Sequence, residues 1–121
     1  MLEFDIMKPE GIVVLTPIGA LSEQDFSALN GAVDAYLAVE TGIRGVLIRT
    51  KAFPGWASFA GFAAHIRFVH DHQKRIERVA LVTDSPVADF AEALAKPFLT
   101  ARIRHFPYAE RDAALAWLKM P

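Results

Sequence analysis

Aromatic and hydroxyl-bearing side chains gather just after an apolar run that ends at Arg49. Phe53, Trp56 and Ser58 stand in the sequence FPGWAS, whose Gly and Pro are typical of a loop. Large rings with a few polar anchors suit a small apolar ligand. Polar side chains also follow the later apolar runs, and the carboxyl ends of parallel strands meet at one edge of a sheet. The sequence therefore predicts a ligand site at this rim, formed by Phe53, Trp56, Ser58, Asp84, Ser85 and Tyr108.

Two interpretations of the aromatic pair stay open. Phe53 and Trp56 could line an open pocket, or they could close the end of the hydrophobic core as buried side chains, which is common for large aromatics. Ser58 has a second interpretation as the N-cap of the helix that follows it. The sequence does not decide between these alternatives.

The histidines raise the question of a metal site. His65 and His72 share a face of one predicted helix, but seven residues separate them by about 10 Å, too far for one ion. We therefore predict no metal site, and histidines that are solvated or face a partner. Phe68 lies off the main apolar stripe of that helix, so it either packs under a neighbouring helix or marks a dimer contact. The candidate interface is thus His65, Phe68 and His72.

The chain lacks the patterns that catalysis requires. A nucleophile needs an oriented base, and no nucleophile elbow, paired-carboxylate motif or phosphate-binding loop is present. Gly55 and Gly61 do not form a dinucleotide fingerprint. We therefore expect a protein that is not an enzyme and that needs no cofactor.

Composition narrows the remaining classes of protein. The 121 residues are 53% hydrophobic and 22% charged, with a net charge of -1, which gives no reason to expect nucleic acid. Cysteine is absent, so disulfides and thiol chemistry are excluded. No apolar run approaches the roughly 20 residues of a membrane span. We expect one domain over residues 1–121 and a cytoplasmic protein of bacterial type, without a transmembrane segment.

Hydrophobic periodicity predicts an α/β fold. Two short strands around a Pro-Glu-Gly turn form an N-terminal hairpin, and alternating helices and strands follow. The second helix should bury a stripe of Phe59, Phe62, Ala63, Ile66 and Val69. The expected helices cover Ser22–Leu37, Ser58–His72, Val87–Leu94 and a last segment anchored by Trp117, and the strands cover Leu2–Ile6, Ile12–Leu15, Gly45–Arg49, Arg78–Thr83 and Thr100–Phe106. This order predicts a mixed, mostly parallel sheet with packed helices.

Several passages together resemble the SpoIIAA-like family of STAS-like domains. They are the strand–FPGW–helix passage, HDHQKRIERVALVTD, KPF before the last strand, RIRHF within it and the terminal AALAWL. The family is similar in fold to anti-sigma-factor antagonists and CRAL-TRIO lipid-binding domains. The resemblance covers nearly the whole chain and implies successive β-α units, but no established activity.

The resemblance yields two hypotheses about function. The first is a non-enzymatic domain that binds a small apolar or lipid-like ligand at the strand-end rim. The alternative is a STAS-type regulatory module that binds a protein partner or forms a homodimer. In anti-sigma-factor antagonists a phosphorylated serine lies at the start of the helix after the third strand, and Ser58 has a similar place. The acidic DSSG-type surroundings of that serine are replaced here by PGWASFAG.

Overall fold

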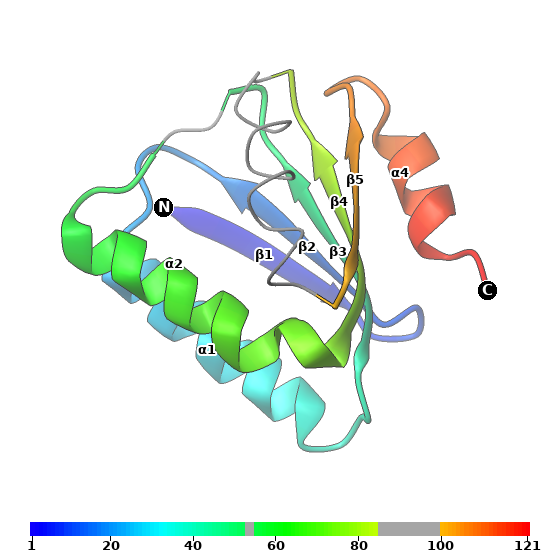
Figure 1. Ribbon diagram of the computed structural model, residues 1–121, viewed down its shortest axis with the longest axis horizontal. Helices are drawn as coiled ribbons and strands as arrows, with labels where there is room; N and C mark the ends of the chain where they lie inside the picture. Colours follow the sequence, from blue (N-terminus) through cyan, green and yellow to red (C-terminus); the bar gives the residue numbers. More distant parts are fainter. Residues whose placement is uncertain (53–54, 85–99) are drawn as a thin grey trace.

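The computed structural model describes residues 1–52, 55–84 and 100–121, except for the side chains of Phe59 and Phe62. The strands of this part form one mixed sheet in the order β1-β2-β3-β4-β5 (Figure 1). The β1–β2 pair is antiparallel and the other pairs are parallel, as the sequence predicts. The strands are β1 Leu2–Met7, β2 Ile12–Pro17, β3 Ile43–Arg49, β4 Ile76–Val82 and β5 Arg102–Phe106.

Helices cover both faces of the sheet. α1 (Glu23–Leu37) and α2 (Phe59–His72) lie together on one face, and α4 (Arg111–Leu118) lies on the other (Figure 1). A short 3₁₀ turn, η1 (Gln73–Arg75), joins α2 to β4. No helix within the described residues is both long and apolar enough to cross a membrane. The helix predicted over Val87–Leu94 lies outside those residues.

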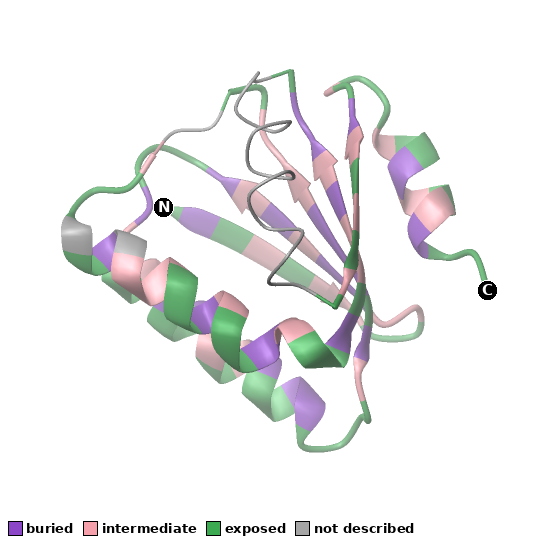
Figure 2. Ribbon diagram, in the orientation of Figure 1, coloured by how far each residue is buried: buried purple, intermediate pink, exposed green. Residues whose placement is uncertain are grey.

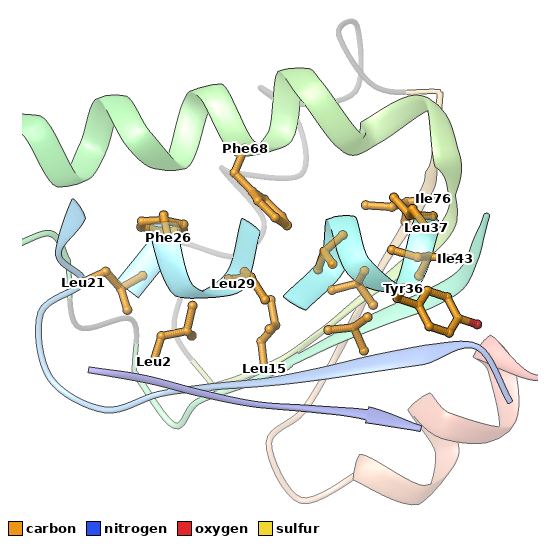
Figure 3. Packing of buried hydrophobic residues seen from close by; sticks show 13 residues of the cluster. Leu2, Leu15, Leu21, Phe26, Leu29, Tyr36, Leu37, Ile43, Phe68 and Ile76 are labelled. Atoms are coloured by element: carbon orange, nitrogen blue, oxygen red, sulfur yellow. The ribbon is translucent and has the colours of Figure 1, made fainter. Parts of the chain in front are cut away.

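Alternation along the strands divides the core into two clusters. On one face, Phe26, Leu29 and Val33 of α1 pack with Val13 and Val46 of the sheet (Figure 3). On the other face, α4 packs against the sheet through a smaller cluster of Ile12, Leu47, Val82, Ala114 and Leu118. Figure 2 shows buried residues along the central strands, between the two helical layers. The two-residue period of a strand sends neighbouring side chains to opposite faces, so each central strand serves both clusters.

A capping box fixes the start of α1. Ser22 is the N-cap, and its hydroxyl accepts from the backbone N–H of Asp25 at 3.2 Å. The Asp25 carboxylate accepts in return from the Ser22 N–H at 2.8 Å, and also from the Leu2 N–H of β1 at 3.1 Å. Burial alone would raise the pKa of Asp25, but the hydrogen bonds from Ser22 and the nearby N-terminal ammonium together outweigh it and lower that pKa. One carboxylate thus joins the edge strand to the first helix.

The buried face of α2 differs in part from the predicted stripe, of which Ala63 and Val69 are half-buried and the side chains of Phe59 and Phe62 lie outside the described residues. Ile66 is 54% exposed, while Phe68 is 8% exposed and His72 is 5% exposed. α2 packs against α1, and the ring of Phe68 lies 6.5 Å from the ring of Phe26. Apolar residues occur on two sides of this helix in the sequence, so periodicity alone offered two candidate faces. The contact with α1 selects the face of Phe68, and the prediction for Ile66 was wrong.

Gly61 brings the first turn of α2 against the chain that precedes α1. A Cβ at this position would lie 2.7 Å from the backbone oxygen of Leu21. We expect Gly61→Ala to lower the free energy of unfolding by about 1–3 kcal/mol, because the clash involves backbone and cannot relax locally. Urea unfolding would measure this change.

Gly31→Ala is the matched control, since Gly31 lies on α1 with no atom within 4 Å of its added Cβ. That variant should raise the free energy of unfolding by about 0.5–1 kcal/mol through helix propensity alone. Equal stabilisation by both substitutions would contradict the close approach at Gly61.

Candidate functional site

The predicted ligand residues do not form one group. Trp56 and Ser58 lie in the passage that leads into α2, whereas Asp84 and Tyr108 follow β4 and β5. Figure 1 shows the start of α2 at one side of the molecule and the ends of β4 and β5 at another. Phe53 and Ser85 lie outside the described residues. The described part of the rim therefore forms two separate sites.

Trp56 is held firmly and is also partly exposed. The chain on either side of it pairs with Leu21: the Leu21 N–H donates to Gly55 O at 2.9 Å, and the Ala57 N–H donates to Leu21 O at 2.8 Å. The indole N–H donates to Nδ1 of His65 at 3.1 Å. The side chain is 37% exposed, so Trp56 does not close the core as a buried plug.

His65 links Trp56 to the core. Its ring stacks on Phe26 of α1, with the ring centroids 4.9 Å apart. Burial holds the pKa of His65 below its ordinary value of 6.5. Nδ1 accepts the hydrogen bond from the indole N–H, so in the neutral imidazole the ring proton is on Nε2. The stack of Phe26, His65 and Trp56 thus needs a neutral histidine.

Ser58 is the N-cap of α2. Its hydroxyl oxygen accepts from the Gly61 N–H at 3.2 Å, and the residue is exposed. This is the capping interpretation of the sequence. Phosphorylation of Ser58 stays a prediction; a phosphate there would meet the free N–H groups of the first turn.

At the rim near β4 and β5, described side chains form hydrogen bonds with the backbone of a neighbouring loop. Asp84 accepts from the Tyr108 N–H at 3.0 Å, and Arg49 donates to Tyr108 O at 3.2 Å. The guanidinium of Arg49 also lies 4.0 Å from the centre of the Tyr108 ring. Asp84 and Tyr108 therefore fasten the loops after three strands to one another. Tyr108 is the centre of this network, and Arg49, which the sequence did not single out, is one of its two partners.

Two of the three candidate interface residues are internal. Phe68 is buried between α1 and α2, so the packing alternative holds for it and the dimer contact does not. His72 is buried as well, which corrects the prediction of a solvated or partner-facing histidine. Its ring nitrogens lie 2.8 Å from Phe68 O and 2.8 Å from a carboxylate oxygen of Asp34 on α1. Burial of these side chains joins the two helices within one chain.

Two further features of the described residues concern metal binding and a surface cleft. Within residues 1–52, 55–84 and 100–121, no three histidine, aspartate or glutamate side chains are placed to hold a metal ion. A cleft of about 720 Å³ opens at the amino ends of the strands, at the opposite end of the sheet from the predicted rim. Tyr36 is among its lining residues. Sequence patterns gave no signal for this cleft, because its walls come from three segments that are distant in the sequence.

Comparison with known proteins places the fold. The family model described as SpoIIAA-like matches residues 12–119. A crystal structure of an uncharacterised protein of the DUF3478 family from Shewanella loihica PV-4, with a SpoIIAA-like fold, is similar at a TM-score of 0.79. The two chains share 19% identity over 98% of this chain and 92% of the other. No curated protein matches the sequence.

The neutral state of His65 makes stability depend on pH. The folded protein binds fewer protons at this site than the unfolded chain, because its pKa is lowered on folding. The contribution of His65 is therefore complete above pH 6.5 and decreases as the pH falls below that value. Urea unfolding at a series of pH values should show this decrease in the wild type, and a smaller one in His65→Gln.

His70→Gln is the matched control, because His70 is exposed on the same helix. It should retain the wild-type slope between neutral and mildly acidic pH. A His65→Gln variant with the full wild-type slope would show that the stack does not depend on a neutral imidazole.

Proposed function

Because the chain belongs to the SpoIIAA-like family, we propose that it acts by binding rather than by catalysis, with a protein partner that docks on the Trp56 corner. We define this corner as Trp56, Ser58 and His65 at the start of α2. The observation that carries the proposal is the geometry of Trp56, a partly exposed indole on a backbone hydrogen-bonded on both sides. The proposal develops the alternative of a regulatory interaction module.

Rigid, partly exposed tryptophan is well suited to recognition. Trp is enriched among the few residues that dominate protein–protein binding energy, because one side chain buries a large apolar area. The hydrogen bond from Trp56 to His65 and the stack of His65 on Phe26 fix the indole before any partner arrives. Less conformational entropy is then lost on binding than with a mobile side chain.

The polar neighbour of Trp56 supports the same surface. Ser58 is exposed at the N-cap, one helical turn before Phe62, and it can form hydrogen bonds at the edge of an interface. An aromatic centre with a polar rim is the usual composition of protein interfaces. A phosphate on Ser58 would change the charge of this rim, which is how such a module would be regulated.

A small apolar ligand at the strand-end rim remains a separate prediction. Its support is weaker than that of the Trp56 corner, because the Asp84 carboxylate already accepts from the Tyr108 N–H and the Tyr108 ring is covered by the guanidinium of Arg49.

Trp56→Ala tests the proposal. Proteins retained from a lysate of the source organism by wild type would be identified, and the affinity for each purified candidate would then be measured by calorimetry. We expect at least about tenfold weaker binding by Trp56→Ala, as for a dominant interface residue. The intact mass of the protein isolated from cells would show any phosphate on Ser58.

Val39→Ala is the matched control, since Val39 is 81% exposed just beyond the other end of α1. It should bind each partner like the wild type. Equal binding by Trp56→Ala and wild type would contradict the proposal. A small molecule found in native mass spectra of the wild type but lost from Trp56→Ala would instead favour the ligand hypothesis.

A further inference from the structure

The cleft at the amino ends of the strands is built by segments that are distant in the sequence. Its walls come from the β1–β2 turn, the stretch from the end of α1 to the start of β3, and the η1–β4 junction. Figure 1 shows these segments gathered at the end of the sheet away from the start of α2. The volume of about 720 Å³ lies within the usual range for small-molecule sites.

Tyr36 gives this cleft a hydroxyl group on a nearly buried side chain. The residue is 8% exposed, and its hydroxyl forms no hydrogen bond within the described part of the chain. Figure 3 shows the ring at the edge of the core cluster with its oxygen pointing away from the other buried side chains. Burial and then the charge of Glu40 raise the pKa of Tyr36 above 10.0. The hydroxyl therefore stays protonated at neutral pH and can both donate and accept.

Gly11 leaves that hydroxyl accessible. It has a φ of +70°, in the left-handed region that favours glycine, at the β1–β2 turn. A Cβ on Gly11 would lie 3.3 Å from the Tyr36 hydroxyl oxygen. Any larger side chain there would crowd the oxygen. The absence of a side chain at Gly11 therefore keeps the Tyr36 hydroxyl accessible from the cleft.

Side chains of both signs of charge line the cleft, and most of them have no partner within the described residues. Six charged side chains form no hydrogen bond or ion pair within residues 1–52, 55–84 and 100–121: Lys8, Arg44, Lys74, Glu10, Glu40 and Glu77. Arg75 differs from them, because it donates to the carbonyl oxygens of Leu37, Glu40 and Thr41 at the end of α1. Balanced charge disfavours a multiply charged anion and suits a ligand that carries both signs.

We propose that this cleft binds a small zwitterion with one ammonium and one carboxylate group, in the manner of a free amino acid. The ammonium donates to the Tyr36 hydroxyl and pairs with the Glu40 carboxylate, because the carbonyl oxygens at the end of α1 are already engaged by Arg75. The carboxylate pairs with two cationic side chains that line the cleft, Arg44 and Lys74. The site is independent of the Trp56 corner, which lies at the other end of α1.

Solution NMR of the full chain tests the proposal. Common L-amino acids are titrated into labelled protein, with acetate, inorganic phosphate and methylammonium as probes that carry one sign of charge. We expect saturable shifts of the Gly11, Thr41, Gly42 and Arg44 amides with at least one amino acid, and weaker shifts with the single-sign probes. Equal shifts with acetate or phosphate would replace the proposed zwitterion site by a simple anion site and overturn the proposal.

Tyr36→Phe removes only the hydroxyl and should fold with unchanged stability, because that group has no partner within the described residues. We expect about tenfold or greater loss of amino-acid affinity, the effect of losing one hydrogen bond to a charged group. Tyr108→Phe, at the opposite end of the sheet, is the matched control and should bind like the wild type. An absence of saturable shifts with every amino acid, or unchanged affinity in Tyr36→Phe, would overturn the proposal.

Discussion

The pairing of the Leu21 backbone with the passage before α2 is the contact on which the rest of the helical layer depends. Leu21 is buried, and both its N–H and its carbonyl are bonded to the segment from Gly55 to Ala57. The absence of a side chain at Gly61 lets α2 begin directly against this pair. Both helix starts are thereby fixed, and the positions of His65, Phe68 and His72 against α1 follow from the direction of α2.

The two ends of the sheet use their polar side chains differently. At the carboxyl ends, the side chains of Arg49 and Asp84 both bind the backbone of Tyr108 and so connect β3 with the segments after β4 and β5. At the amino ends, the hydroxyl of Tyr36 and the charges around it have no such partners within the described residues. A polar group already engaged by its own chain must lose that bond before it binds a ligand, whereas an unengaged one loses only water. The unengaged polar groups of the described residues therefore favour the proposed cleft at the amino ends of the strands over the Asp84–Tyr108 part of the rim.

The strands could be predicted from the sequence because the central ones are short apolar runs rich in Val and Ile, and the edge strands β1 and β5 alternate apolar and polar residues. The Ser22 cap could be predicted because its partner lies only three residues away. The buried face of α2 could not, since apolar residues occur on two of its sides and only the contact with Phe26 selects one. The sequence identified Trp56 and Ser58 as candidate site residues, but it did not predict the contacts of Trp56 with His65 or of His65 with Phe26. The hydrogen bond from Arg49 to Tyr108 joins residues 59 positions apart, and local sequence patterns do not predict such a pair.

α1 connects the two surfaces and also separates them. Phe26, under the Trp56 corner, and Tyr36, at the cleft, are ten residues apart, about 15 Å along a helix. Both are nearly buried in the same cluster, so neither can move without disturbing the packing of the other helix and the sheet. A well-packed helix transmits little unless it has two stable positions, and nothing in the described contacts of α1 provides a second one. A ligand in the cleft and a partner at the Trp56 corner should therefore bind without excluding or assisting each other.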